Sequence, residues 1–321
     1  MPPRRKTGRR ILRAFLPIIL LLALVLVAIT GWIVYGVTRP PRQEYLVTPE
    51  KFTQLSGPGL KASEETWTNR DGTPARGWLL RGGEGAPAVI LLHRYGADRS
   101  WLLNLGVKLN ETTNFTILWP DLRGHGLNPP VNWTSFSTRE ADDVQAALDY
   151  LRSLKTSQDR PLVGADVGLY GVELGAYTGL QAAARSKDLK ALVLDSVPAT
   201  PNDILNNAVR DRTGMDNGFA QWLARTGMKA YFMGGYSDAP SCPAASQLSD
   251  RQVLLLASKD TPQLQSATVA LARCFPQGAS VEVQSELPVS GYNLRLATGE
   301  QAEVYDRRVI DFLDKALRIS R

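Results

Sequence analysis

The sequence contains little histidine and little cysteine, and its first thirteen residues include no acidic side chain. Two histidines and two cysteines occur among 321 residues. These numbers are too small for a metal scaffold rich in either residue, or for a mini-domain held by several disulfides. We therefore expect no metal site and no cofactor. Hydrophobic residues make up 44% of the chain, which is enough for an ordinary globular core.

The formal net charge of +6 comes entirely from the N-terminus. Six of the 37 basic residues lie within the first thirteen positions, and they are Arg4, Arg5, Lys6, Arg9, Arg10 and Arg13. The remaining basic residues equal the 31 acidic residues of the chain in number. A nucleic-acid-binding domain needs an excess of positive charge on the surface that meets phosphates. The neutral remainder therefore makes nucleic acid an unexpected partner.

Residues 14–37 carry no charge and are apolar on every side of a helix. About 20 such residues cross the hydrocarbon core of a bilayer as a helix, so we expect a single-pass membrane protein. A cleaved signal peptide is the alternative. Its apolar region would usually be shorter, about 7 to 15 residues, and a small-residue cleavage site would follow it. No such site follows residue 37.

The basic residues around this segment predict its orientation. Residues 1–13 form a basic tail, whereas only Arg39 and Arg42 follow the apolar segment closely. Because basic flanks remain in the cytoplasm, we expect the N-terminus there and the rest of the chain on the periplasmic or extracellular side. Residues 38–60 are rich in proline and glycine and lack helical periodicity, so we interpret them as a tether.

Residues 61–321 predict one α/β domain. Short apolar runs alternate with amphipathic stretches, which is typical of a mostly parallel sheet with helices on both faces. The eight expected strands are 64–69, 75–81, 88–92, 115–119, 167–170, 191–195, 252–257 and 280–284, and the expected helices are 98–110, 140–155, 174–186, 263–274 and 303–318. A two-residue Asp71-Gly72 turn makes the first strand pair antiparallel. Residues 198–250 are interpreted as a small lid insertion.

Three segments resemble the α/β-hydrolase superfamily, and they follow one another in the family's order. VILLHRYGADRS at 89–100 is similar to the strand and loop that supply one oxyanion donor. WPDLRGHGLN at 119–128 is close to the family's D-x-R-G-H-G turn, and LYGVELGAYTGLQAA at 169–183 stands where the nucleophile elbow would be. The anchored, compact form looks like the Bem46-like or serine-aminopeptidase-like branch. The resemblance implies an α/β-hydrolase fold over nearly the whole soluble part.

The elbow of this sequence lacks the hydroxyl nucleophile. The elbow holds its central residue on a strained strand-to-helix turn, which requires small neighbours two positions away. Gly171 and Gly175 meet that requirement, but the central residue is Glu173 where the family has Ser, Cys or Asp. The nucleophile position is therefore degenerate.

The rest of the implied triad is also incomplete. The resemblance implies a histidine after the last strand, yet His93 and His125 both precede the elbow. The family's terminal G-H segment best matches Gly291-Tyr292, which puts Tyr292 at the histidine position. Asp260 is the candidate for the acid after the seventh strand. We interpret both histidines as structural, and recruitment of either one for catalysis is the alternative.

The resemblance assigns the oxyanion donors to the amides of Tyr95 and Leu174. Because a carboxylate is favoured at the start of a helix, we hypothesise that Glu173 folds back into this vestigial hole as a built-in anion. The sequence leaves open whether Cys242 and Cys274 form a disulfide, since geometry decides it.

These features predict a membrane-anchored, α/β-hydrolase-like module without serine-type hydrolase activity. It would bind a small-molecule ligand or a protein partner. Two alternatives stay open at this stage. One is an active esterase or peptidase with a rearranged site that uses Asp260 and Glu173 through water, and the other is a scaffold at the membrane with the lid as its interface.

Overall fold

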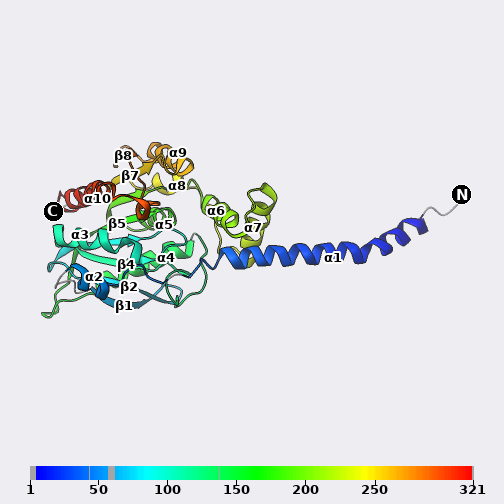
Figure 1. Cartoon of the computed structure of the whole chain (residues 1–321), viewed down its shortest axis with the longest axis horizontal. Coiled ribbons are helices and arrows are strands. Elements are labelled where there is room, and N and C mark those ends of the chain that lie inside the picture. The colour runs from blue at the N-terminus through cyan, green and yellow to red at the C-terminus, as the bar shows by residue number, and fades with distance from the viewer. Residues whose placement is uncertain (1–4, 43, 57–61, 137, 320–321) are drawn as a thin grey trace.

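The computed structural model describes residues 5–42, 44–56, 62–136 and 138–319. Residues 1–4 of the expected basic tail and 57–60 of the expected tether lie outside the described residues. Helix α1 (Arg5–Val37) projects from an α/β domain, as Figure 1 shows. Its segment Phe15–Val37 is long and apolar enough to cross a membrane, a test that a signal sequence would also pass.

The centre of the domain is one eight-stranded sheet in the order β1-β2-β4-β3-β5-β6-β7-β8. The strands are β1 (Ala62–Thr68), β2 (Pro74–Leu80), β3 (Ala86–Leu92), β4 (Thr116–Pro120), β5 (Val163–Val172), β6 (Leu189–Asp195), β7 (Gln252–Ser258) and β8 (Ser280–Leu287). β1 and β2 run antiparallel to their neighbours, and the other pairings are parallel. The expected mostly parallel sheet of eight strands is confirmed.

Helices cover both faces of the sheet because each face carries an apolar layer. On one face α3 (Leu103–Thr113) and α10 (Gly299–Ile319) pack on the strands. On the other lie α4 (Thr138–Ser153), α5 (Leu174–Ala183) and α9 (Pro262–Leu271). Short 3₁₀ turns occur at Arg99–Leu102, Ala272–Cys274 and Leu294–Leu296. All the helices expected from the amphipathic stretches are present.

The turn between β1 and β2 is one residue longer than predicted. The Asn69 N–H donates to the Thr73 carbonyl at 2.8 Å, which leaves three residues in the loop. Gly72 has φ +80°, the left-handed conformation that such three-residue loops place at their last position. The strands remain antiparallel, so the longer turn changes the local geometry and not the topology.

The lid insertion consists mainly of α6 (Pro201–Thr213), α7 (Gly218–Tyr231) and α8 (Ser241–Ala245). Thr200 and Asp203 form a capping box at the start of α6, and Gly214 ends it at φ +68°. A disulfide joins Cys242 of α8 to Cys274. It links the end of the lid to the segment that follows α9.

The C-terminal turns of α1 are part of the domain core. Ile33, Val34 and Val37 are buried there, and α1 packs against both α6 and α7. Figure 1 shows α6 and α7 beside this end of α1, on the side of the domain from which α1 projects. The lid and the apolar helix therefore form one packed unit.

The segment after α1 is more ordered than its composition suggests. Residues expected to be irregular form α2 (Pro49–Ser56), because Pro49 suits the first turn of a helix. The Tyr45 hydroxyl donates to Asp121 Oδ2 at 2.7 Å, and the Leu46 amide donates to Ser100 Oγ at 3.0 Å. These bonds attach the segment to the domain.

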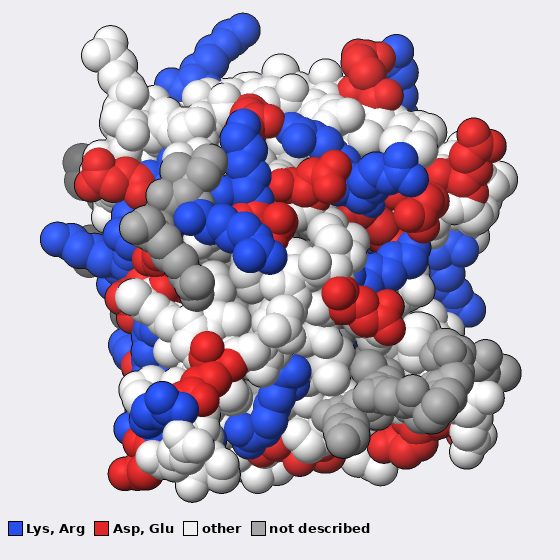
Figure 2. All heavy atoms as spheres, turned by 90° about the vertical axis from the view of Figure 1, so that its left-hand side faces the viewer, with Lys and Arg blue, Asp and Glu red and all other residues white. Residues whose placement is uncertain are grey.

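Basic and acidic side chains alternate over the face of the domain opposite to α1. In the view of Figure 2, Lys and Arg are interspersed with Asp and Glu across the described residues. This mixture matches the neutral composition of the chain beyond its basic tail. The face in this view therefore offers no continuous basic surface for phosphates.

Candidate functional site

Glu173 stands at a sharp turn between β5 and α5. Its backbone has φ 48° and ψ −103°, a conformation that residues other than glycine rarely adopt. A Cβ atom at Gly171 would lie 2.5 Å from the backbone of Gly175, and one at Gly175 would lie 2.4 Å from the Leu92 carbonyl oxygen. The turn therefore requires glycine at both flanking positions.

The Glu173 carboxyl group is buried and bonded to backbone amides. Its Oε2 accepts the Tyr95 N–H at 3.0 Å, and the adjacent Leu174 amide acts to lower the pKa of the carboxyl group. Burial raises the pKa of Glu173 to about 7, although the Arg94 charge and the two amides act in the opposite direction. At neutral pH the carboxyl group is therefore divided between its protonated and ionised forms.

Tyr292 lines the same cavity as Glu173. The Arg94 guanidinium carbon lies 4.5 Å from the centre of the Tyr292 ring and 4.7 Å from that of Trp101. The charge of Glu173, together with burial, raises the pKa of Tyr292 to about 12. The phenol therefore stays protonated at neutral pH and cannot act as the general base that an imidazole would supply.

Asp260 is held by the loop that carries Tyr292. Its Oδ2 accepts hydrogen bonds from the Ser290 amide and hydroxyl, both at 3.0 Å, and from Asn293 Nδ2 at 3.2 Å. Asp260 lies outside the set of described residues that line the cavity beside Glu173. The structure thus brings Glu173 and Tyr292 together, and it connects Asp260 to them only through residues 290–293.

Asp195 supports the same loop, and the sequence analysis did not identify it. This buried carboxyl group accepts the Gly291 N–H at 2.7 Å and the Ser196 hydroxyl at 2.6 Å, and it also accepts the Tyr305 hydroxyl. Burial raises its pKa to about 6. The sequence signal that could have identified Asp195 is its position as an acidic residue at the end of a buried strand, β6. Its bond to Gly291 fixes the backbone next to Tyr292.

The cavity beside Glu173 has a volume of about 350 Å³. The end of α1, the loop after β3, helix α6 and Tyr292 contribute to its walls. Its charged side chains are Arg39, Arg94, Glu173, Asp211 and Arg212. The three arginines could not be predicted as a group because they come from three distant segments of the chain. Arg94, next to His93 in the loop after β3, was the one local signal.

Two guanidinium nitrogens at this cavity have no acceptor among the described residues. They are Arg39 Nη1 and Arg94 Nε, both shielded from solvent. Buried N–H groups are normally paired, because an unpaired one loses its bond to water without a replacement. Because both atoms are shielded from water, they are unsatisfied N–H groups of the fold and not contacts that a ligand in the cavity could reach.

Both histidines are engaged in structural bonds away from Glu173. The His93 Nε2 accepts the Leu122 N–H at 3.0 Å, so its Nδ1 carries the proton and donates to the Arg94 carbonyl at 2.8 Å. His125 Nδ1 pairs with the Arg123 carbonyl at 2.9 Å. Burial lowers the pKa of His93 to about 4 and that of His125 to about 3. Both rings therefore stay neutral within the fold.

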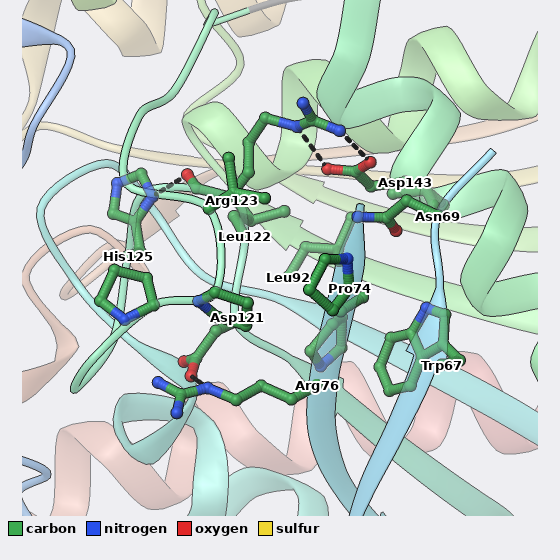
Figure 3. A pocket seen from close by; sticks show the side chains of 16 residues that line it. Trp67, Asn69, Pro74, Arg76, Leu92, Asp121, Leu122, Arg123, His125 and Asp143 are labelled. Atoms are coloured by element: carbon green, nitrogen blue, oxygen red, sulfur yellow. Dashed lines mark hydrogen bonds and ion pairs between the residues drawn. The ribbon is translucent and has the colours of Figure 1, made fainter. Parts of the chain in front are cut away.

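A second hollow, next to His125, is too small for a ligand. Figure 3 shows Arg123 paired with Asp143 and Arg76 paired with Asp121 around it. Its volume of about 20 Å³ has room for roughly one water molecule. The larger cavity beside Glu173 is therefore the better candidate for a binding site.

Comparisons with known proteins agree with this architecture. A sequence model described as the alpha/beta hydrolase family matches residues 89–288, and no curated protein matches the sequence. The structure is similar to the esterase Pf2001 of Pyrococcus furiosus, with TM-score 0.67 and 18% identity over 87% of this chain and 98% of that one.

Two further solved structures share the fold. The alpha/beta hydrolase GrgF from a Penicillium species has TM-score 0.57 and 18% identity, covering 81% of this chain and 100% of its own. Est1E from Butyrivibrio proteoclasticus has TM-score 0.52 and 16% identity, covering 81% and 99%. The family match extends over more than half of the residues and contains the turn at Glu173. The chain belongs to the alpha/beta hydrolase family.

Proposed function

We propose that this protein is a membrane-anchored binding module that has lost serine-type hydrolysis. The observation that carries the proposal is the Glu173 carboxyl group, which accepts the amide of Tyr95 and lies next to that of Leu174. In an acyl-transfer enzyme, two such amides must be free to stabilise the oxyanion of the transition state. Here a side chain of the protein accepts a hydrogen bond from the Tyr95 donor, as expected for a plug in a vestigial oxyanion hole. The remaining groups support the same conclusion, since Tyr292 stands where the triad would need an imidazole.

The catalytic part of the proposal predicts no turnover by the unaltered chain. In nanodiscs, the full chain should hydrolyse p-nitrophenyl butyrate and alanine p-nitroanilide no faster than buffer does, because it has neither a hydroxyl nucleophile nor a free base. Glu173→Ala should be equally inactive. Turnover by the parent that Glu173→Ala abolishes would instead support the alternative, an active hydrolase with a rearranged site.

The charges of the cavity favour an anionic ligand. Arg39, Arg94 and Arg212 face only two carboxyl groups, and Glu173 is partly protonated at neutral pH. Asp211 also lies within 3.8 Å of Arg210, which reduces its effect on the cavity. The mixture of guanidinium groups with the side chains of Tyr95, Ile204 and Ala208 suits an amphiphile with a carboxylate or similar head.

Octanoate is a suitable probe of this specificity. At ten times its Kd it should stabilise the full chain by about 1.4 kcal/mol in thermal unfolding, whereas octylamine should not. Arg212→Gln should weaken the effect. Arg185→Gln is the control, because Arg185 pairs with Asp142 on the surface of the domain and lies outside the set of described residues that line the cavity. Equal stabilisation by octylamine, or none by octanoate, would contradict the proposed ligand class.

We further propose that α1 anchors the protein and is retained. Ile33, Val34 and Val37 belong to the domain core, so cleavage after α1 would uncover the apolar surface that they cover. The basic residues before the span favour a cytoplasmic N-terminus and an exoplasmic domain. The disulfide between Cys242 and Cys274 is consistent with that side, since disulfides persist in oxidising compartments.

Thiol labelling of the protein in its native membrane tests this topology. We expect no alkylation of Cys242 or Cys274 by N-ethylmaleimide in denaturant, and full alkylation of both after reduction, because the exoplasmic side maintains the disulfide. Intact mass should include residues 1–37. Free thiols without a reductant, or a mature chain that begins after α1, would contradict the proposed topology.

A further inference from the structure

Helix α7 of the lid carries an uncharged stripe on its exposed side. Phe219, Trp222, Thr226 and Ala230 are exposed and follow one another at helical spacing. Phe219 is 61% exposed and Trp222 is 50% exposed, and their rings stack at 6.0 Å. Met233, just beyond the helix, is 91% exposed. We call the four helical residues the lid stripe.

An adjoining side of α7 packs against the apolar helix α1. A Cβ atom at Gly227 would lie 2.6 Å from side-chain atoms of both Thr30 and Val34, so the two helices approach closely there. Ala224 and Met228, next to Gly227 on this side, are fully buried. The lid stripe is therefore carried by a helix in direct contact with the last turns of the proposed membrane span.

The length of α1 places this contact at the membrane surface. Because Ile33, Val34 and Val37 are buried in the domain, the segment Phe15–Trp32 is the part of the apolar helix that is available to the bilayer. It has roughly 18 residues, or about 27 Å at 1.5 Å per residue, close to the thickness of a hydrocarbon core. Trp32 and Tyr35 are more than half exposed at its end, as expected for aromatic residues at the interface. Thr30 and Val34 thus lie at the boundary between hydrocarbon and headgroups.

We propose that the lid stripe is a second membrane contact, inserted into the exoplasmic leaflet beside α1. The inference rests on the proposed membrane span. Phe219 and Trp222 are exposed on a helix that packs against the span. The bilayer is therefore the nearest apolar phase to this aromatic pair. Arg225 and Lys229, which helical geometry places beside the stripe, suit the headgroup region.

This contact would also determine how ligands reach the cavity. Gly36 and Arg39, at the end of the span, and Arg212, on the helix before α7, line the cavity beside Glu173. If the lid stripe rests in the leaflet, the cavity lies at the membrane surface. An anionic amphiphile dissolved in that leaflet is then the class of ligand with the shortest path to the three arginines.

Quenching of tryptophan fluorescence by brominated lipids tests the lid contact and the span separately. The full chain is placed in nanodiscs of phosphatidylcholine brominated at carbons 6 and 7, which reports on residues near the interface. Trp222→Phe and Trp32→Phe should each remove about half of the lipid-quenched intensity, since both rings are expected at interface depth. Trp67→Phe is the matched control and should remove none, because Trp67 stacks on Tyr150 within the domain.

The two substitutions separate the two proposals. If Trp32→Phe removes lipid quenching and Trp222→Phe does not, the span stands and the lid contact is overturned. If neither substitution reduces lipid quenching, both the membrane span and the lid contact are overturned. If Trp222 is protected from aqueous acrylamide but is not quenched by the lipid, a second copy of the chain covers the lid stripe, and that result too overturns the membrane contact.

Discussion

Replacing Glu173 by serine and Tyr292 by histidine together is expected to give the protein esterase activity that neither replacement gives alone. Serine would place a hydroxyl on the strained turn, free the amide of Tyr95 and remove the carboxyl group beside the amide of Leu174. Histidine at 292 would place an imidazole on the loop that bonds to Asp260. Because nucleophile and base act as a unit, each single variant should stay near background, while the double variant gains on the order of 10²- to 10⁴-fold. The measurement is release of p-nitrophenol from p-nitrophenyl butyrate.

The control for this gain is Glu173→Ala with Tyr292→His. It frees the same amide and adds the same imidazole but lacks the hydroxyl, so it should remain inactive. Melting temperatures should be compared throughout, because the loss of Tyr292 also removes the ring that Arg94 covers. An inactive double variant that melts like the parent would show that the assignment of Glu173 and Tyr292 to triad positions is wrong.

Glu173→Gln is expected to remove a large part of the pH dependence of stability. Burial raises the pKa of Glu173 from 4.5 to about 7, so the folded state favours the protonated carboxyl group. That contribution to the free energy of unfolding is fully present below about pH 4.5 and is lost as the pH rises to about 7. The loss is about 3 kcal/mol, and glutamine, which keeps the shape but does not titrate, avoids it.

Thermal unfolding of both proteins at pH 5 and pH 8 measures this difference. Between pH 5 and pH 8, the melting temperature of Glu173→Gln should rise relative to that of the parent by roughly 5 to 10 °C. Groups that titrate in the same way in both proteins do not contribute to this difference. Glu303→Gln is the control, since Lys108 lowers the pKa of that exposed carboxyl group and its titration therefore lies below pH 5, so its pH profile should stay parallel to that of the parent between pH 5 and pH 8. Parallel pH profiles for the parent and Glu173→Gln would contradict the burial of an ionisable carboxyl group at this turn.

Much of the fold could be predicted because its signals are local. Apolar runs located all eight strands, and amphipathic periods located the helices that cover them. The errors are local too. The turn at Gly72 has three residues instead of two, and Pro49 begins a helix in a segment expected to be irregular. In both cases proline, glycine and other turn residues predicted that a strand or helix ends there, but they did not predict the conformation of the segment that follows.

For the candidate site, the sequence predicted the identity and order of residues, whereas the contacts between them came only from the tertiary structure. Sequence alone determined that Glu173 stands between Gly171 and Gly175 and that no histidine follows residue 125, because these are facts of identity and order. Only the tertiary structure decided that the Glu173 carboxyl group accepts the Tyr95 amide and that Asp195 holds Gly291. The grouping of three arginines around one cavity and the packing of α1 against the lid were decided in the same way. Such contacts join residues far apart in the chain, and the order of strands in the sheet brings them together, whereas hydrophobic periodicity reports only on neighbours.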